Sequence, residues 1–191
     1  MATTLAEILN IDYPVSVEAS ERLLGVAREL KVKKGEYLVR QGFKSDCIYF
    51  ILEGLFRGVH MRDGQEETLL FATEGDPFAS VHSMAGNEPA SFSWQALEAS
   101  KVLAVGFSDF RGLLRAEPDL HWWWSNALLD QLYVLERRYV WIGNTSATQR
   151  YETLLRIRPG IIGRIPVKYI AQYLNIKPET LSRIRAVFAR K

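Results

Sequence analysis

Near its C-terminus the chain reads IPVKYIAQYLNIKPETLSRIRAVF over residues 165–188. Two short amphipathic segments flank a break at residues 174–177. In the first segment, apolar residues recur at i, i+3, i+4 and i+7, the spacing of one buried helical face, and Pro166 suits a first helical turn. The stretch predicts two helices joined by a tight turn, and the buried face of the first consists of Val167, Ile170, Ala171 and Leu174.

The turn and the second helix have a consistent chemistry. Asn175 lies where the chain must turn sharply, and asparagine is, after glycine, the residue that best tolerates a left-handed backbone. Pro178 starts the second helix, and small Ala171 lets the two helices cross closely. The inward face of the second helix is Leu181, Ile184 and Phe188, and its opposite, polar stripe is Glu179, Ser182, Arg183, Ala186 and Arg190. These are the requirements of a helix-turn-helix, whose second helix enters a DNA groove.

The alternative is an ordinary helix pair with Glu179 and Arg183 as an ion pair on a solvated face, worth about 0.2–0.5 kcal/mol. Charge favours the first interpretation. The net charge is +2, but residues 147–191 hold ten Lys/Arg against two Glu, a formal +8 that leaves −6 on the first 146 residues. A basic block beside an acidic body indicates that one end meets a polyanion. Charge alone does not separate DNA from RNA or an anionic membrane.

Composition sets the outer limits. A chain of 191 residues with 48% hydrophobic content can form one large domain, or a medium and a small one. No apolar run approaches the roughly 18 residues of a membrane helix, and the N-terminus lacks the pattern of a secretory signal. The single cysteine, Cys47, excludes an intrachain disulfide and a cysteine-rich iron–sulfur or zinc site. A cytoplasmic protein is expected.

Three regions follow one another along the chain. Residues 32–107 alternate apolar and polar side chains between turn signals, which predicts a β-sandwich or barrel. Asp63 and Gly64 predict a hairpin, because both tolerate the positive φ of a primed turn. Helices are expected at roughly 16–30 and 119–143. The predicted division is a β domain with flanking helices at 1–118, a long helix at 119–143, and the basic block at 144–191.

The long helix carries apolar residues on several faces. One set has the 4-3-4-3 spacing of a coiled-coil seam: Leu128, Leu132, Leu135, Tyr139 and Ile142. The alternative is a single helix that packs on the β domain, since the seam is only about two heptads long. A helix that is apolar on more than one side needs more than one partner. We therefore favour a homodimer seam, and expect the tryptophan run at 122–124 to pack at the helix start.

The quoted stretch resembles the helix-turn-helix of the Crp–Fnr (catabolite activator) family, in the branch with a degenerate cyclic-nucleotide cassette. KVKKGEYLVRQG, CIYFILEGLFRG, ETLLFATEGDPF and PASFSWQALEASKVLAV resemble strands of that family's β-roll, and residues 119–143 fall where its dimerisation helix lies. The resemblance covers residues 20–191. It implies an α+β fold: a cyclic-nucleotide-binding-type β-roll (a jelly-roll-like double-stranded β-helix), a long dimerisation helix and a C-terminal winged-helix-type domain. The wing would need strands within the short segment 157–165.

The resemblance also implies a function: a homodimeric, non-enzymatic transcription regulator that binds double-stranded DNA and contacts RNA polymerase. The family's base-contacting positions fall on Glu179 and Arg183, and Pro178 replaces a third contacting side chain. Lys177 and Thr180 match phosphate-contacting positions, and Ser182 shares the polar stripe. Arginine can bind guanine O6 and N7 bidentately, and glutamate can accept from cytosine N4.

The effector pocket departs from the family's pattern. Its phosphate-binding cassette uses a Gly-Glu pair for the ribose and an Arg-Ser pair for the cyclic phosphate. Here Ser80 replaces the glutamate and Ala90 the arginine, and only Ser91 is kept; Val81 and His82 complete the candidate pocket. Without the arginine, cyclic AMP binding by the usual mode is not expected. The effector is open between no small molecule, a β-roll that serves only as scaffold, and a cyclic nucleotide or another ligand in an altered pocket.

Other chemistries have little support. A haem held by a single axial ligand, His82 or Cys47, stays open, although Cys47 is expected to be a buried core residue. A metal site or an enzyme on the β-roll would need clustered histidines, whereas His60, His82 and His121 are far apart in sequence. The chain shows no nucleophile elbow, P-loop or dinucleotide motif. We therefore expect neither a metal site nor catalysis.

Overall fold

The computed structural model describes residues 13–188, apart from the side chains of 141–143. The helices are α2 (Val17–Val26), α3 (Val81–Gly86), α4 (Phe107–Ala116), α5 (Pro118–Asn144), α6 (Ala147–Ile157), α7 (Val167–Tyr173) and α8 (Pro178–Phe188). The strands are β1 (Arg28–Val32), β2 (Tyr37–Val39), β3 (Cys47–Glu53), β4 (Leu55–Arg62), β5 (Gln65–Thr73), β6 (Pro77–Phe78), β7 (Ser93–Ala96) and β8 (Ser100–Gly106). All the described strands lie between α2 and α4 along the chain, and only helices follow them.

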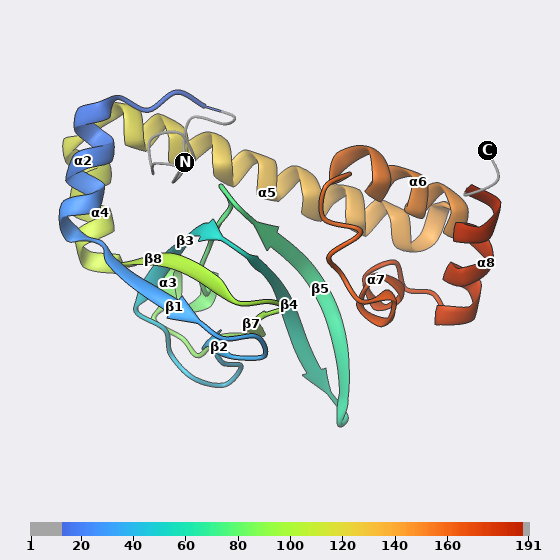
Figure 1. Cartoon of the computed structure of the whole chain (residues 1–191). Helices are drawn as coiled ribbons and strands as arrows, with labels where there is room; N and C mark the ends of the chain where they lie inside the picture. The colour runs from blue at the N-terminus through green and yellow to red at the C-terminus, as the bar shows by residue number, and fades with distance from the viewer. Residues whose placement is uncertain (1–12, 189–191) are drawn as a thin grey trace.

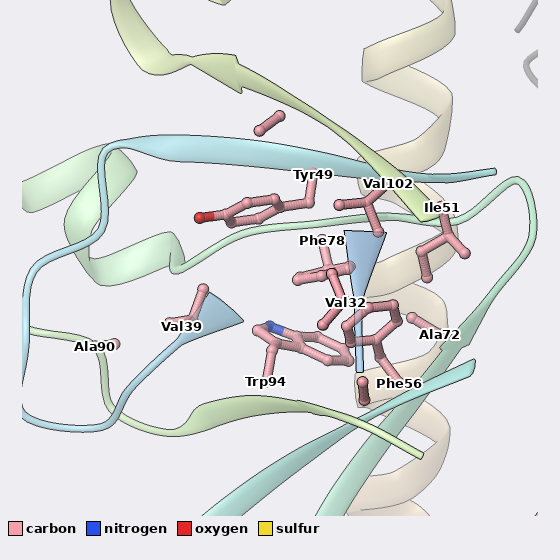
Figure 2. Packing of buried hydrophobic residues seen from close by; sticks show 12 residues of the cluster. Val32, Val39, Tyr49, Ile51, Phe56, Ala72, Phe78, Ala90, Trp94 and Val102 are labelled. Carbon is pink, nitrogen blue, oxygen red and sulfur yellow. The ribbon is translucent and has the colours of Figure 1, made fainter. Parts of the chain in front are cut away.

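The strands form two antiparallel sheets, ordered β1-β8-β3-β6 and β2-β7-β4-β5. Side chains from both sheets interleave between them, as Figure 2 shows. The predicted β-roll is therefore confirmed. Its buried interior consists of Val32, Val39, Tyr49, Ile51, Phe56, Ala72, Phe78, Ala90, Trp94, Ala96, Val102 and Ala104.

Two turns of the β-roll depend on special backbone geometry. Asp63 and Gly64 have φ of 51° and 76° at the tip of the β4–β5 hairpin, which confirms the predicted primed turn. Gly54 joins β3 to β4 with a φ of 119°, and a Cβ there would lie 2.0 Å from Oγ of Ser100. Only glycine allows the chain to pass from one sheet to the other so close to β8.

Three helices cover one end of the β-roll. The inner faces of α2 and α4 and the start of α5 share a core around Leu23, Phe50, Phe110 and Trp123 (Figure 1). The expected helix at 16–30 is too long, because α2 ends at Val26 and the chain continues as β1. The residues of β1 pair antiparallel with β8 along its whole length, and that long-range pairing overrides the helical pattern.

The long helix is confirmed as α5, which has one more residue at each end than expected. It runs across the β-roll from α2 and α4 to the C-terminal helices (Figure 1). Trp123 is buried and Trp124 half-buried at its start, as expected, whereas Trp122 is exposed. No helix among residues 13–188 combines the length and the apolar content that crossing a membrane requires.

The C-terminal helices α6, α7 and α8 surround their own core. The segment between α6 and α7, where the strands of a wing would lie, consists of turns that bury Ile161, Ile162 and Ile165. Leu55 and Leu97 of the β-roll belong to the same apolar cluster. The C-terminal helices and the β-roll are therefore joined by packing as well as by α5.

Candidate nucleic-acid interface

The break between α7 and α8 is a tight turn held by backbone hydrogen bonds. Asn175 has a φ of 51°, so the predicted left-handed residue is confirmed. Its N–H donates to the carbonyl of Gln172 at 3.0 Å, and the N–H of Ile176 donates to that of Ala171 at 3.0 Å. These bonds satisfy the carbonyls that the end of α7 leaves free. The two helices thus have the connection of a helix-turn-helix.

Apolar packing fixes the two helices against each other. Ile170, Ala171, Leu174 and Leu181 are each at most 1% exposed. Phe188 packs edge-on against the ring of Tyr151 in α6, with ring centres 5.5 Å apart. Val167 is 37% exposed, so the buried face of α7 starts one turn later than the sequence pattern indicates. The polar stripe of α8 is therefore presented from a rigid base.

The polar stripe faces solvent. Glu179, Ser182, Arg183 and Ala186 are exposed, and Arg190 lies outside the described residues. Lys177 is exposed beside the helix start and Thr180 is half-buried. The hydroxyl of Ser182 donates to the carbonyl of Pro178 at 3.0 Å, so it is engaged within its own helix. Within residues 13–188 no ion pair joins Glu179 to Arg183, and both side chains stay available to a partner.

Several cations of the basic block face the protein instead of solvent. The guanidinium of Arg150 donates to the carbonyls of Leu174 and Thr145 at 2.9 and 2.6 Å. Arg158 binds both carboxylate oxygens of Asp76, at 2.8 and 3.1 Å. The count of +8 therefore overstates the charge available to a polyanion. Sequence reasoning missed these pairings because their members lie up to 82 residues apart along the chain.

Arg164 makes the most extensive of these contacts. It binds both carboxylate oxygens of Glu74 at 2.9 and 2.8 Å, and also contacts Glu98. Burial raises the pKa of Glu74, but hydrogen bonds from Arg164, from Thr73 and from the N–H of Gly54 outweigh it and bring the pKa to about 2. The same carboxylates raise the pKa of Arg164. The pair is ionised on both sides over the whole physiological pH range.

A buried arginine joins the β-roll to α7. Arg57 is 1% exposed and donates to Gln95 at 2.9 Å, to Thr68 at 3.3 Å and to Glu66 at 2.6 Å. Its guanidinium carbon lies 3.7 Å from the centre of the Tyr169 ring in α7. Such a cation–π contact is strongest where water is excluded, as it is here.

Hydrogen bonds and a second arginine extend this contact. The side-chain amide of Gln172 in α7 donates to the carbonyl of Glu66 at 2.9 Å, and its oxygen accepts from the hydroxyl of Thr68 at 2.7 Å. Arg138 of α5 lies over the ring of Tyr173, 5.1 Å from its centre, and donates to the carbonyl of Thr68 at 3.3 Å. Burial lowers the pKa of Arg138. A single surface of α7 is thus bound to β5 and α5 together.

The proposed seam of α5 is open to solvent in the single chain. Leu128, Leu132, Leu135 and Tyr139 are 46%, 60%, 51% and 85% exposed, and the side chain of Ile142 lies outside the described residues. Four large apolar side chains in a row on one helix face form a patch that soluble proteins usually cover with a partner. The start of α5 already packs on the β-roll and on α2 and α4, whereas this row farther along the helix remains exposed.

The candidate effector residues do not converge on one cavity. Oγ of Ser80 accepts from the N–H of Ser83 at 3.2 Å and so caps α3. Val81 is 69% exposed, and exposed His82 lies 3.6 Å from Glu88. Ala90 is buried in the β-roll interior, whereas Ser91 is exposed. Two clefts, of about 630 and 530 Å³, lie instead between the β-roll and the C-terminal half of the chain.

Aromatic side chains are grouped in the middle of the β-roll interior, and Ala90 lies to one side of them, near Val39 (Figure 2). The ring of Phe78 lies 4.8 Å from that of Trp94, 4.9 Å from that of Phe56 and 5.1 Å from that of Tyr49. The indole N–H of Trp94 donates to the carbonyl of Ala79 at 3.3 Å. These contacts fix the rings in place and pack this part of the interior closely.

Of the candidate ligands, Cys47 is poorly suited to a metal or a haem. Cys47 is half-exposed, not buried as expected, because its thiol lies at the edge of the β-roll beside Asp46. Partial burial and that carboxylate raise its pKa to about 11, which disfavours the thiolate that metals bind. Among the residues from 13 to 188, no three His, Cys, Asp or Glu side chains gather in the manner of a metal site.

Comparison with known proteins identifies the first part of the chain. Residues 29–117 match the cyclic nucleotide-binding domain family. In the structure these residues include the strands of the two-sheet β-roll and helix α4. The chain is 24% identical over 159 residues to the cAMP-activated global transcriptional regulator CRP of Salmonella typhimurium, and the alignment covers 77% of this chain and 75% of that protein. It is 29% identical over 117 residues, 61% of its length, to patatin-like phospholipase domain-containing protein 6 of Pongo abelii, of which it spans only 8%.

The similarity in structure extends beyond this domain. The structure of FixK2 from Bradyrhizobium japonicum superposes with a TM-score of 0.73 at 20% identity, covering 86% of this chain and 85% of that one. The chain thus has the fold of the Crp–Fnr regulators, with β-roll, long helix and C-terminal helices in the same order. Within the matched residues, Ala90 is buried and the rings of Tyr49, Phe56, Phe78 and Trp94 pack against one another.

Proposed function

We propose that this chain is a sequence-specific, DNA-binding transcription regulator of the Crp–Fnr type. The observation that carries the proposal is the exposed polar stripe of α8, set behind the left-handed turn at Asn175 and backed by a core shared with α7. This is the arrangement by which a helix-turn-helix offers its second helix to the major groove. The fold shared with FixK2 and CRP supports it.

In this proposal α8 reads base edges. Arg183 would bind guanine bidentately and Glu179 would accept from cytosine, since both side chains are exposed on one face. Lys177 and the N-terminal turn of α8, with Thr180, would contact phosphate. Ser182 lies on the same face, but its hydroxyl already donates to the carbonyl of Pro178. Its small side chain would therefore let α8 approach the DNA closely without donating a hydrogen bond to it.

The regulator would act as a homodimer. The exposed row Leu128, Leu132, Leu135 and Tyr139 supports pairing of two α5 helices, and Ile142 would extend the row. A two-fold dimer presents two equivalent α8 helices, so its half-sites should lie about 34 Å apart. Such a regulator would act in the cytoplasm, contact RNA polymerase and have no catalytic role of its own.

Regulation without a small effector is the second element of the proposal. The packed interior around Trp94, the buried Ala90 and the use of Ser80 as a helix cap all favour a β-roll that serves as scaffold. A cyclic nucleotide would meet neither the arginine nor the glutamate that bind it in related domains. The alternative is a different ligand in an altered pocket, and a thermal-shift screen would reveal it as a raised melting temperature.

Selection from random double-stranded DNA tests the proposed function. The purified chain, with no nucleotide added, should enrich a two-fold symmetric sequence with half-sites about ten base pairs apart. Binding of the enriched site should exceed binding of a scrambled site by at least a hundredfold at moderate salt. Equal affinity for all sequences, or no binding at low salt, would refute the proposal.

A further inference from the structure

The C-terminal helices are attached to the outer face of their own β-roll by two sets of contacts. One set pairs Arg158 with Asp76 and Arg164 with Glu74 and Glu98. The other stacks buried Arg57 on Tyr169 and joins Gln172 to Glu66 and Thr68. We call these contacts together the interdomain clasp. All of them join residues at least 66 apart in sequence, so they fix the relation between two domains and not a local fold.

The clasp is built on rigid groups. The guanidinium of Arg57 donates hydrogen bonds to Gln95, Thr68 and Glu66 within the β-roll, and these bonds orient it toward Tyr169. Glu74 accepts from the N–H of Gly54 at 2.8 Å and from Thr73, so its carboxylate is oriented before Arg164 binds it. Contacts with oriented partners lose less conformational entropy than contacts between free side chains. The clasp therefore favours one orientation of α7 on the β-roll.

The clasp leaves the polar stripe of α8 free. Helix α7 packs on β5 with one face and on α8 with another, and Figure 1 shows α8 beyond α7 from the strands. Tyr169 and Gln172 contact the β-roll, whereas Glu179, Ser182 and Arg183 remain exposed. A domain attached in this way need not be released before α8 meets DNA.

We infer that the interdomain clasp, not a bound ligand, holds the helix-turn-helix in its DNA-binding orientation, with Arg57, Arg158 and Arg164 as positioning residues. The inference rests on the proposed function and adds to it the means of control. The rings of Tyr49, Phe56, Phe78 and Trp94 pack against one another inside the β-roll, and the clasp supplies the orientation of α7 and α8 that a ligand would otherwise have to induce. In a dimer, the two clasps together set the spacing and tilt of the two α8 helices.

The decisive test uses Glu98→Gln. For this substitution the loss of negative charge and the loss of a clasp contact predict opposite changes in DNA affinity. Glu98→Gln removes a negative charge, so general electrostatics predicts tighter DNA binding. It also removes a carboxylate from Arg164, so the clasp predicts weaker binding of the selected site, by at least threefold, with little change on scrambled DNA. Glu29→Gln removes an equal charge from an exposed position on β1 and serves as the matched control.

Two arginine variants complete the experiment, all without added nucleotide. Arg164→Ala should lose at least tenfold in affinity for the selected site and less than threefold for scrambled DNA, with the dimer intact by light scattering. Arg156→Ala, an exposed neighbour on α6, removes the same charge and should weaken both DNAs alike. Should wild type fail to bind any DNA selectively, the proposed function itself falls.

Three other results would contradict this inference and leave the proposed function intact. Selective wild-type binding with unchanged affinity in Glu98→Gln and Arg164→Ala would show that the clasp does not position α8. Tighter binding by both variants would show that the clasp restrains the domain in an inactive orientation. An increase of tenfold or more in the affinity of wild type for the selected site on adding cyclic AMP, cyclic GMP or cyclic di-GMP would show that a ligand controls the orientation of α8.

Discussion

The guanidinium of Arg57 lies over the ring of Tyr169, 3.7 Å from its centre, and so connects the outer face of the β-roll to the first helix of the helix-turn-helix. Arg57 is already paired with Glu66 of β5, and the ring of Tyr169 in α7 stacks on the same guanidinium. Two domains that the sequence separates by a long helix are thereby in direct contact.

Removal of this ring should destabilise the chain. Tyr169→Ala deletes the cation–π contact and its packing, and we expect the free energy of unfolding to fall by about 2 kcal/mol, since the contact is desolvated. Tyr169→Phe keeps the ring and should change it by less than about 0.5 kcal/mol. Urea denaturation followed by circular dichroism measures both. Equal losses in the two variants would show that the hydroxyl, not the ring face, matters.

The exposed row on α5 predicts the assembly state. Leu135→Glu should give monomers, because it places two carboxylates against each other in an apolar seam from which water is excluded. Leu24→Glu changes another exposed leucine, on α2, and should leave the dimer unchanged. Light scattering at several concentrations distinguishes the two. A monomeric wild type, or a dimer that survives Leu135→Glu, would contradict the seam.

Glu74 predicts how the stability of the chain depends on pH. Its pKa is about 2 in the folded chain against an ordinary 4.5, so the folded state favours the ionised carboxylate. The stabilisation is therefore fully present above about pH 4.5 and is lost as pH falls toward 2. Glu74→Gln should be less stable than wild type at pH 7, and the difference in urea midpoint should shrink between pH 5 and 3. A difference that is constant with pH would contradict the assignment.

The filled β-roll predicts the response to nucleotide. Calorimetry should detect no binding of cyclic AMP at micromolar concentrations, because Ala90 supplies no cation and lies buried. Ala90→Arg would introduce a charge into the closely packed interior, and we expect it to lower the melting temperature without creating a site. Tight binding by wild type would show that the cassette is aligned incorrectly or that the interior opens.

Local signals in the sequence predicted much of this fold. Asp63-Gly64, Asn175 and the helical spacing around Ile170 each act over a few residues, and the structure confirms them. The end of α2 and the partners of Arg164 could not be predicted in the same way. The first depends on the pairing of β1 with β8, and the second on carboxylates about 66 to 90 residues away. Contacts of that range leave no periodic pattern, so charge counting assigned Arg158 and Arg164 to a polyanion.

The DNA contact itself is tested at Arg183. If Arg183 binds a guanine edge, Arg183→Ala should cost about 1–3 kcal/mol on the selected site and relax the preference at one base pair in each half-site. Affinity for scrambled DNA should change less. The measurement is a binding series on the selected site and on its single-base variants, because a lost base contact appears as equal affinity for the four bases at that position.

Lys177→Ala is the control that distinguishes a lost base contact at Arg183 from a lost phosphate contact. An exposed lysine beside the start of α8 is placed to contact phosphate, which is the same in every sequence. Its loss should weaken all DNAs alike and reduce the slope of log affinity against log salt by about one unit. Arg183→Ala should instead change base preference more than the slope. If neither affinity nor preference responded to Arg183→Ala, the stripe of α8 would be an ordinary solvated face and the helix-turn-helix would be a fold without that use.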